Sequence, residues 1–453
     1  MINRRSFLKM FALTAAGIPV IAAAASKPKP NFIFFLADDL GWTDLGGFGS
    51  SFYESPNIDK LCAEGMKFTA SYCAGSVCSP TRSSIITGRV PARTGCTQFG
   101  GSVSGKEYCF AQDLEKAGYA TFFTGKWHVG GKSPTEAGFS ISMDLKRNKN
   151  LQDDPKGTGL ITKNTMEFLR GVKDQPFFAY VNYHAVHAPA KERQEIVDKY
   201  QKKLKSNPPK PGEPRGLEVE NRRSNKQVQD DAAFAAMIDV MDSSVREILE
   251  EVKAMGAEEN TVVIFSSENG GFSTTVKGCT SNLPLRAGKG WLYEGGIRVP
   301  TIIKWPAMIK ANSVCDVPIN STDFYPTILE IAGLPLRPED HCDGLSLVNL
   351  LKTGIAPARD AMYWHYPHHH GSGNSPSGAV RMGDYMLIHY FETDVVELYN
   401  VKEDISQLTD LAKSMPEKTD EMLQTLKTWQ KTIPGIVFEE TEKSKKKKAP
   451  KGK

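Results

Sequence analysis

The stretch Asn31-Phe-Ile-Phe-Phe-Leu-Ala37, which Asp38 and Asp39 follow at once, decides the fold class. A continuous apolar run of this length predicts a strand that is buried on both faces. Similar runs recur at residues 119–124, 176–182 and 261–265, with helical segments between them. Strands that alternate with helices indicate an α/β fold, in which helices sandwich a large, mostly parallel sheet.

Helical and antiparallel segments can also be identified in the sequence. Pro56 favours a helix start and predicts a helix to about residue 64, and apolar residues at helical spacing predict a long helix over 228–255. After about residue 358 the pattern changes to short runs separated by turn residues, which predicts a small antiparallel sheet followed by a last helix. The three runs and the helix lie at 378–382, 385–390, 395–399 and 417–431.

The composition is that of a globular protein, and its charge argues against one class of partner. Of the 453 residues, 40% are hydrophobic and 24% are charged, which excludes a disordered or collagen-like chain. The formal net charge of +4 is concentrated at the ends, because residues 1–25 carry +3 and residues 443–453 carry +7. Residues 26–442 therefore carry −6, and a mildly acidic body lacks the electrostatic basis for binding nucleic acid.

Residues 1–25 have the features of an export signal. Arg4-Arg5, followed by Phe7-Leu8 and an apolar run, resembles a bacterial twin-arginine signal; a general secretory signal and a short anchor are the alternatives. We expect the twin-arginine translocase as a partner, a periplasmic or extracellular location, and a mature chain that is not an integral membrane protein. An oxidising destination would permit disulfides among the eight cysteines, which the sequence cannot pair.

Polar residues follow each of the four long strands. Parallel strands place their carboxyl ends at one edge of a sheet, where ligands bind in open α/β folds, so we expect these residues to converge. Carboxylates and an amide oxygen suit a hard cation, while lysine and histidine suit an anion beside it. In chain order the residues are Asp38, Asp39, Gly125, Lys126, Trp127, His128, His184, His187, Glu268 and Asn269.

The segment Cys78-Ser-Pro80-Thr-Arg82 predicts a helix with Pro80 in its first turn and Gly88 at its end. Cys78 would then lie at the helix N-terminus, where free N–H groups and the helix dipole favour an anion. Arg82 would lie one turn further along. For Cys78 taken alone, a buried or disulfide-bonded cysteine is the alternative.

Several motifs together resemble the formylglycine-dependent sulfatases of the alkaline phosphatase superfamily, in particular the exported bacterial enzymes that act on polysaccharides and glycosaminoglycans. The resemblance spans about residues 31–400. Its main motif is Cys78-x-Pro80-x-Arg82, which is followed by the run from Ser84 to Arg89. The other motifs occur in the family's order. They are Asp38-Asp39, Gly125-Lys-Trp-His128, His187-Ala-Pro189, Glu268-Asn-Gly-Gly271, Lys289 to Pro300, Asp323 to Thr327 and Asp343 to Leu347.

The resemblance implies a modified residue and a metal. A formylglycine-generating maturase would oxidise Cys78 to formylglycine (3-oxoalanine), whose hydrate attacks sulfur through one hydroxyl and later expels sulfate through the other. A calcium ion would polarise the sulfate and activate the attacking hydroxyl. Its ligands would be Asp38, Asp39, Glu268, Asn269 and an oxygen of the modified Cys78. The family more often has Asp at position 268, and the extra methylene of Glu shifts the carboxylate by about 1.5 Å, which flexible calcium coordination accommodates.

The resemblance also implies roles for the other site residues. Arg82 would support the hydrate, while Lys126 and Lys289 would bind the sulfate oxygens, where charge develops in the transition state. His128 would position or deprotonate the hydrate. His187 would contact the substrate and protonate the leaving alcohol oxygen.

The predicted organisation has four parts after the resemblance is applied. The signal peptide covers residues 1–25, the sulfatase catalytic domain 26–358, the C-terminal subdomain 359–442 and a flexible Lys-rich tail 443–453. Residues 202–226 are rich in Pro, Lys, Arg and Asn, which predicts an exposed insertion. The tail is expected to be solvated, with binding to an anionic polymer as the alternative.

A sulfated glycan, with galactose- or N-acetylgalactosamine-type sulfates first, is the substrate that the resemblance favours. In the segment from Trp364 to His370, His365 is a candidate for the substrate rim, with a transition-metal tract or a solvated loop as alternatives. Arg381 is a candidate for an additional sulfate or carboxylate. The alternative functions are a formylglycine-dependent phosphate or phosphonate monoester hydrolase and a catalytically inactive glycan-binding module.

Overall fold

The computed structural model describes residues 28–145, 153–172, 175–210, 216–275 and 278–434. The predicted signal peptide and the Lys-rich tail lie outside the described residues. Within the described ranges, no helix combines the length and apolar character that a membrane span requires. All eight cysteines fall inside these ranges and all are free thiols.

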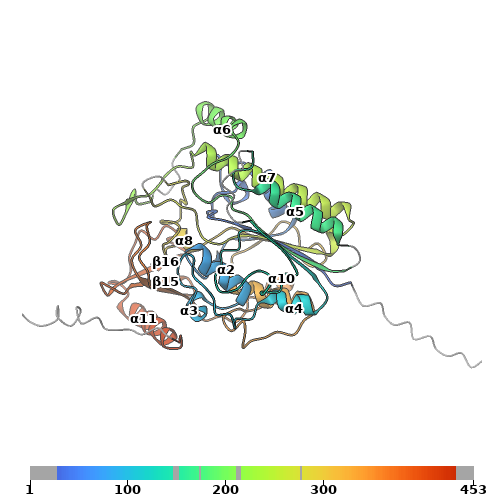
Figure 1. Ribbon diagram of the computed structural model, residues 1–453. Coiled ribbons are helices and arrows are strands. Elements are labelled where there is room, and N and C mark those ends of the chain that lie inside the picture. Colours follow the sequence, from blue (N-terminus) through green and yellow to red (C-terminus); the bar gives the residue numbers. More distant parts are fainter. Residues whose placement is uncertain (1–27, 146–152, 173–174, 211–215, 276–277, 435–453) are drawn as a thin grey trace, which may run out of the picture.

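An eight-stranded sheet forms the centre of the molecule (Figure 1). One strand, β10, is antiparallel to both of its neighbours, and every other adjacent pair is parallel. The prediction of a large, mostly parallel sheet is therefore confirmed. In spatial order the strands are β11 (Ser313–Cys315), β2 (Met66–Phe68), β10 (Thr301–Lys304), β9 (Thr261–Ser267), β1 (Asn31–Ala37), β6 (Phe177–Asn182), β4 (Ala120–Gly125) and β5 (Ile141–Asp144).

The side chains of β1 alternate between two hydrophobic cores, one on each face of the sheet. Phe32 and Phe34 belong to one core, while Ile33 and Phe35 belong to the other, and all four are fully buried. Successive side chains of a strand point to opposite faces, so a strand covered on both faces has to be apolar at every position. This explains the continuous apolar run from which the fold was predicted.

Helices cover both faces of the sheet (Figure 1). On the face of Ile33 and Phe35, α7 packs against α5, α6 and α1, and on the other face α4 and α2 pack against α9. The first group comprises α1 (Pro56–Glu64), α5 (Thr158–Gly171), α6 (Gln194–Ser206) and α7 (Ala232–Ala254). The second group comprises α2 (Cys78–Thr87), α4 (Phe110–Lys116), α9 (Phe324–Ile331) and α10 (Val348–Thr353). The short elements are β3 (Ser71–Tyr72), β12 (Ile319–Asn320), α3 (Pro91–Thr94) and α8 (Glu294–Ile297), with 3-10 turns η1 (Gly46–Phe48), η2 (Glu258–Asn260) and η3 (Ser321–Asp323).

The four strands with long apolar runs are direct neighbours, in the order β9-β1-β6-β4, and they end at the same level. Ala37 at the end of β1 pairs with Ser267 at the end of β9. Asn182 at the end of β6 pairs with Leu36 on one side and with Gly125 at the end of β4 on the other. The residues that follow each strand therefore emerge at one edge of the sheet, as the sequence predicts.

A second, antiparallel sheet lies C-terminal to the first and carries α11 on one face (Figure 1). The three predicted strands and the last helix are confirmed, and a further strand precedes them. The elements are β13 (Met362–Tyr366), β14 (Ser377–Met382), β15 (Tyr385–Tyr390), β16 (Val395–Asn400) and α11 (Pro416–Lys431). The helix packs on this sheet through Leu426 and Met422, against Val380, Leu387 and Leu398.

The region predicted as an exposed insertion, 202–226, contains regular structure. Residues 202–206 form the last turn of α6, and a two-stranded hairpin follows in β7 (Val219–Glu220) and β8 (Arg223–Ser224). Glu220 and Asn225 are buried, whereas residues 217–219 and 221–224 are exposed. The composition of the segment did not reveal that the buried Glu220 anchors it to Arg286 elsewhere in the protein, or that the Asn225 side chain bonds within it to the Leu217 carbonyl.

Truncation of Leu426 is expected to weaken the attachment of α11 to the C-terminal sheet. Leu426 is fully buried in that core, and replacing a buried leucine by alanine typically costs about 2–5 kcal/mol. Urea unfolding of Leu426→Ala should show this loss of unfolding free energy. Gln424→Ala, an exposed position on the same helix, is the control and should change it by less than about 0.5 kcal/mol. Equal effects at both positions would contradict the packing described here.

Candidate functional site

The ends of β1 and β4 place the first site residues. Asp38 continues β1 and its backbone N–H donates to the Ala185 carbonyl, while Asp39 turns away with a φ of 60°. At the end of β4, Gly125 has a φ of 98°, and a Cβ there would lie 1.7 Å from the Asn182 carbonyl oxygen. Only glycine allows this close approach, which leaves the Lys126 N–H free to donate to that oxygen at 3.0 Å.

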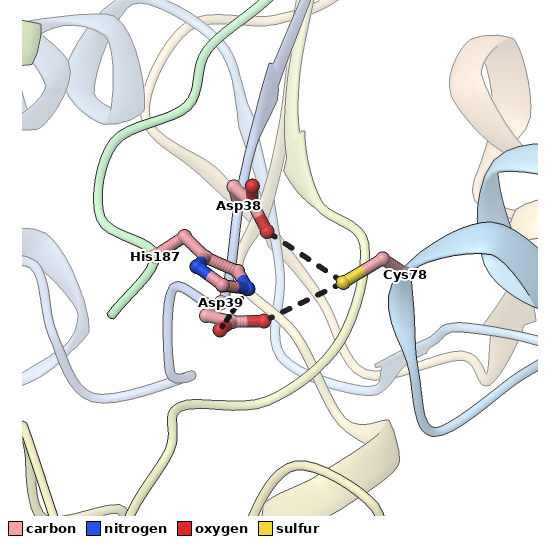
Figure 2. A group of neighbouring side chains, drawn as sticks. All are labelled: Asp38, Asp39, Cys78 and His187. Atoms are coloured by element: carbon pink, nitrogen blue, oxygen red, sulfur yellow. Dashed lines mark hydrogen bonds and ion pairs between the residues drawn. The ribbon is translucent and has the colours of Figure 1, made fainter. Parts of the chain in front are cut away.

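Helix α2 brings Cys78 to the same edge of the sheet. Cys78 is the first residue of the helix, as predicted, and Gly88 ends it in the left-handed conformation. The Cys78 Sγ atom lies 3.8 Å from Asp38 Oδ1 and 4.0 Å from Asp39 Oδ1. Figure 2 shows these side chains and His187, from the loop after β6, pointing toward one another. The free N–H groups of the first helical turn favour an anion beside Cys78.

Arg82, one turn along α2, connects the helix to three strands. Its guanidinium is 2% exposed and donates to the Asn182 side-chain oxygen at 2.7 Å and to the Lys126 carbonyl at 2.6 Å. It also forms an ion pair with Glu268, which follows β9. Burial raises the pKa of the Glu268 carboxyl, and the Arg82 guanidinium opposes that shift.

Two lysines each pair with one of the adjacent aspartates. Lys126 Nζ donates to Asp38 Oδ2 at 2.6 Å, and Lys289 Nζ lies 2.7 Å from Asp39 Oδ1 and 3.4 Å from Cys78 Sγ. Burial alone would raise the pKa values of both aspartates, but the lysines and His187 outweigh it and lower them. The aspartates in turn raise the pKa of each lysine, so all four groups are held in their charged forms.

The histidines of the site differ in their surroundings. His187 Nδ1 lies 2.5 Å from the Ala188 carbonyl, so this nitrogen carries a proton, and its Nε2 lies 3.7 Å from Asp39 Oδ2. His128 has a φ of 55° and packs edge-on against Phe99. Burial, together with Lys126 and Arg82, lowers the pKa of His128 to about 3. His184 bonds to the Leu145 carbonyl, 3.1 Å away, and burial lowers its pKa to about 4.

The oxygen atoms of this cluster fit a hard cation. One ligand atom each from Asp38, Asp39, Cys78 and His187 lies within 4.8 Å of the others. Among the described residues, the buried Asn269 Oδ1 atom has no hydrogen-bond donor, and its amide nitrogen donates to Asp39 Oδ1 at 2.9 Å. A buried amide oxygen without a donor, placed beside three carboxylates, is the donor set that calcium prefers.

The charges divide the site into two sides. Three buried acids, Asp38, Asp39 and Glu268, stand opposite three basic groups, Arg82, Lys126 and Lys289. With all six groups charged the cluster is neutral, so it can receive a cation on the acidic side and an anion on the basic side, whose opposite charges partly offset each other.

Comparison with family models identifies the family to which the chain belongs. The model of the family described as Sulfatase matches residues 30–334, and the model described as N-sulphoglucosamine sulphohydrolase, C-terminal, matches residues 287–432. The chain belongs to the sulfatase family. It is a sulfuric ester hydrolase, and the resemblance found in the sequence motifs is confirmed.

Individual relatives agree with this assignment. A sulfatase of Formosa agariphila is 29% identical over 88% of this chain and 88% of its own, and the N-acetylgalactosamine-6-sulfatase of Rattus norvegicus is 28% identical over 78% and 71%. Among solved structures, that of Ps i-CgsB in complex with k-i-k-neocarrahexaose superposes with a TM-score of 0.74 at 25% identity. That superposition covers 88% of this chain and 92% of the other.

Two residues predicted to contact the substrate of the sulfatase make packing contacts within the C-terminal sheet or between that sheet and β3. The His365 ring packs 5.2 Å from the Phe391 ring, and its Nδ1 lies 3.2 Å from the Gln430 amide nitrogen of α11. Arg381 is buried and donates to the Tyr72 hydroxyl and, at 3.1 Å, to the Gly383 carbonyl. Because strand side chains alternate, His365 faces α11 while its neighbours in β13 face the catalytic domain.

The residues of this segment that do approach the site are Tyr366 and His370. The His370 ring lies directly against Gly290, the residue after Lys289, and the Tyr366 ring centroid lies 6.5 Å from that of His370. A Cβ on Gly290 would overlap the His370 ring. Sequence reasoning also missed Asn182, the last residue of β6 and the partner of Arg82. For Tyr366 the available signal was the alternation of side chains along β13, and for Asn182 it was a polar residue at the last position of a strand.

The partly buried ring of His365 should make stability depend on pH. Burial lowers its pKa to about 4, whereas the unfolded chain has a histidine pKa of about 6.5. Between these values the unfolded state binds a proton that the folded state does not, so the unfolding free energy falls as pH decreases from 6.5 to 4. Urea unfolding at pH 7.5 and pH 5 should show a smaller fall for His365→Phe than for the parent protein. Identical falls would contradict this environment of His365.

Proposed function

We propose that this sulfatase hydrolyses sulfate esters on a sulfated glycan, releases inorganic sulfate, and depends on calcium and on formylglycine at Cys78. The observation that carries the proposal is the position of Cys78. Its Sγ atom lies between the two aspartates and 3.4 Å from Lys289, at the N-terminus of a buried helix. A nucleophile derived from this side chain would lie where both a cation and a sulfate can be held.

Calcium fits the acidic side of the cluster. Asp38, Asp39, Glu268 and Asn269 would hold it together with an oxygen of the modified Cys78, and all of these residues are at most 1% exposed. When bound, the ion supplies Lewis-acid polarisation of the sulfate oxygens. The longer side chain of Glu268 reaches the cluster from the end of β9 while also contacting Arg82.

The basic side would bind and orient the sulfate group. Lys289 is buried and the Lys126 side chain is only 11% exposed, and desolvated positive charge of this kind stabilises the charge that develops on sulfate oxygens. Arg82 holds Glu268 and the ends of β4 and β6 in place. It would therefore support the hydrate indirectly, by keeping these residues in position.

The two histidines suit different roles at the site. His128 stays neutral because its pKa is lowered to about 3, so one ring nitrogen can accept a hydrogen bond from the hydrate and position it. His187 keeps a proton on Nδ1, which donates to the Ala188 carbonyl; in the imidazolium form Nε2 carries the second proton and would deliver it to the leaving alcohol oxygen.

Related proteins support a glycan as the substrate class. One relative is an N-acetylgalactosamine-6-sulfatase, and one structural neighbour was solved with a neocarrahexaose bound. We extend this to galactose- or N-acetylgalactosamine-type sulfates in this chain. The proposal also includes export through the twin-arginine translocase to the periplasm or the extracellular space, and maturation of Cys78 by a formylglycine-generating enzyme.

The first test is sulfate release from a panel of sulfated sugars and polysaccharides, measured by ion chromatography. The protein is produced with a formylglycine-generating enzyme, and mass spectrometry of the Cys78 peptide verifies the aldehyde. We expect release from one class of sulfated glycan and a loss of at least 10³-fold in Cys78→Ala, because the variant lacks the nucleophile.

Phosphate and phosphonate monoesters form the second arm of the same experiment. If these esters were hydrolysed faster than every sulfate ester, the proposal would be wrong and the protein would be a phosphate or phosphonate monoester hydrolase. Glycan binding without turnover, in protein that carries the aldehyde, would indicate the inactive binding module. Sulfate release that persists in Cys78→Ala would contradict the proposed nucleophile.

Removal of calcium should lower stability as well as activity. A ligand that binds only the folded state at a hundredfold excess over its Kd adds about 2.7 kcal/mol to the unfolding free energy. Calcium added to chelator-treated protein should therefore raise Tm, and Asn269→Ala should show a much smaller rise, because it removes the unpartnered oxygen. Glu403→Gln, an exposed acid elsewhere, should respond like the parent protein. The same rise in Asn269→Ala would exclude the proposed ligand set.

A further inference from the structure

The hairpin of β7 and β8 turns through two residues with left-handed backbones. Glu220 pairs with Arg223, and between them Asn221 and Arg222 have φ values of 42° and 65°. Two positive φ values in a two-residue loop define the tight hairpin turn whose favoured sequence is Asn-Gly. Arg222 occupies the position that favours glycine, so the chain keeps a large charged side chain where the backbone conformation disfavours one.

Three contacts fix this hairpin to the rest of the protein. Glu220 is buried and accepts two hydrogen bonds from Arg286, at 2.8 and 2.9 Å. Arg286 donates at 2.9 Å to the Tyr399 hydroxyl of the C-terminal sheet. On the other strand, the Thr275 N–H donates to the Ser224 carbonyl at 3.0 Å. The tip is therefore held in a defined position by the catalytic domain and the C-terminal sheet together.

The tip of the hairpin adjoins the loop that carries His370. The Asn221 side-chain amide donates to the Gly373 carbonyl at 2.6 Å, and the aliphatic part of Arg223 lies directly against Gly373. The Gly373 N–H donates to the His370 carbonyl at 3.0 Å, and His370 lies against Gly290, the residue after Lys289. A short series of contacts thus links the hairpin tip to the basic side of the catalytic cluster.

Arg222 and Arg223 are exposed at this tip, and neither forms an ion pair with any residue that the structure describes. The nearest acids in the chain do not neutralise them. Glu220 is bound to Arg286, and Glu218 is a single exposed carboxylate directly before β7. The hairpin therefore presents net positive charge next to the rim of the site.

We propose that Arg222 and Arg223 form a second anion-binding site, which holds a sulfate or carboxylate group on a neighbouring sugar of the glycan chain while the scissile sulfate ester lies at Cys78. The inference rests on the proposed glycan sulfatase function. It makes the hairpin a determinant of substrate class, because chains with several anionic groups bind more tightly than a sugar with a single sulfate.

The test measures binding, so it does not depend on turnover. Sulfated dextran oligosaccharides are titrated by calorimetry into the Cys78→Ala protein, alone and combined with Arg222→Gly/Arg223→Gln. We expect binding about tenfold weaker in the combined variant, since two solvent-exposed ion pairs are lost. Arg222→Gly should at the same time raise Tm, because glycine suits the left-handed backbone at this position. Arg223→Gln retains the aliphatic part that lies against Gly373.

A matched control removes two positive charges elsewhere. Lys202→Gln/Lys205→Gln changes two exposed lysines of α6 and should leave binding of the sulfated oligosaccharide unchanged. Oligogalacturonates form a second arm, and the anion whose binding weakens identifies sulfate or carboxylate as the group recognised. Equal weakening in the lysine variant would show a general effect of net charge and overturn the proposal, as would unchanged binding of both polymers in the arginine variant.

In active enzyme, inhibition of 4-nitrophenyl sulfate hydrolysis separates this proposal from the proposed function. The arginine variant should keep the parent KM and the parent inhibition by inorganic sulfate, while inhibition by sulfated dextran weakens about tenfold. A parallel loss of inhibition by inorganic sulfate would place the effect in the catalytic cluster and overturn the second site. Absence of sulfate release from 4-nitrophenyl sulfate and from every sulfated sugar of the panel, in protein that carries the aldehyde, would count against the proposed function, whereas the calorimetric result would still decide the role of the hairpin.

Discussion

Three carboxylates buried at the end of one sheet must be compensated by positive charge, and this constraint organises the site. Asp38 and Asp39 follow β1 and Glu268 follows β9, and none is more than 1% exposed. An uncompensated buried carboxylate is strongly unfavourable, so each acid has a basic partner within ion-pair distance. The partners come from α2, from the end of β4 and from the loop before α8. Electrostatic compensation therefore brings together segments that are far apart in the chain.

The same constraint explains which parts of the site could be predicted. Continuous apolar runs predicted β1, β4, β6 and β9. Because parallel strands end at one edge of a sheet, the polar residues that follow these strands were predicted to lie together. The motif around Cys78 then supplied the helix between them. Asn182 was missed because it belongs to the strand itself, and a polar residue at the last strand position resembles an ordinary strand end. Its role became visible only through its bond to Arg82.

The C-terminal sheet shows where composition fails and periodicity would have succeeded. A run of histidines and aromatic residues suggested a substrate rim, and His365 was chosen from it. In β13, however, alternate residues face opposite sides: Tyr363 stacks on Trp429 of α11, whereas Trp364 donates to the Cys73 carbonyl near α2. The run therefore begins in a strand with two different faces, which ends at Tyr366. Tyr366 and His370, on and beyond the inner face, are the members that lie toward Lys289, because His370 contacts Gly290 and its ring centroid lies 6.5 Å from that of Tyr366.

The attachment of the C-terminal sheet also determines how far recognition can extend. Arg286 lies 3.8 Å over the Tyr293 ring and bonds to both Glu220 and Tyr399, so one side chain joins the hairpin, the sheet and the loop that carries Lys289. A ligand group at the hairpin tip and a sulfate at Lys289 would therefore be held by parts of one connected framework. Rigid spacing between two anion sites selects ligands whose charges have the matching separation, because the binding of the second group then costs little additional ordering. Under the proposed function the cluster around Cys78 would recognise the sulfate ester, and specificity for the chain that carries it would depend on the hairpin at the rim.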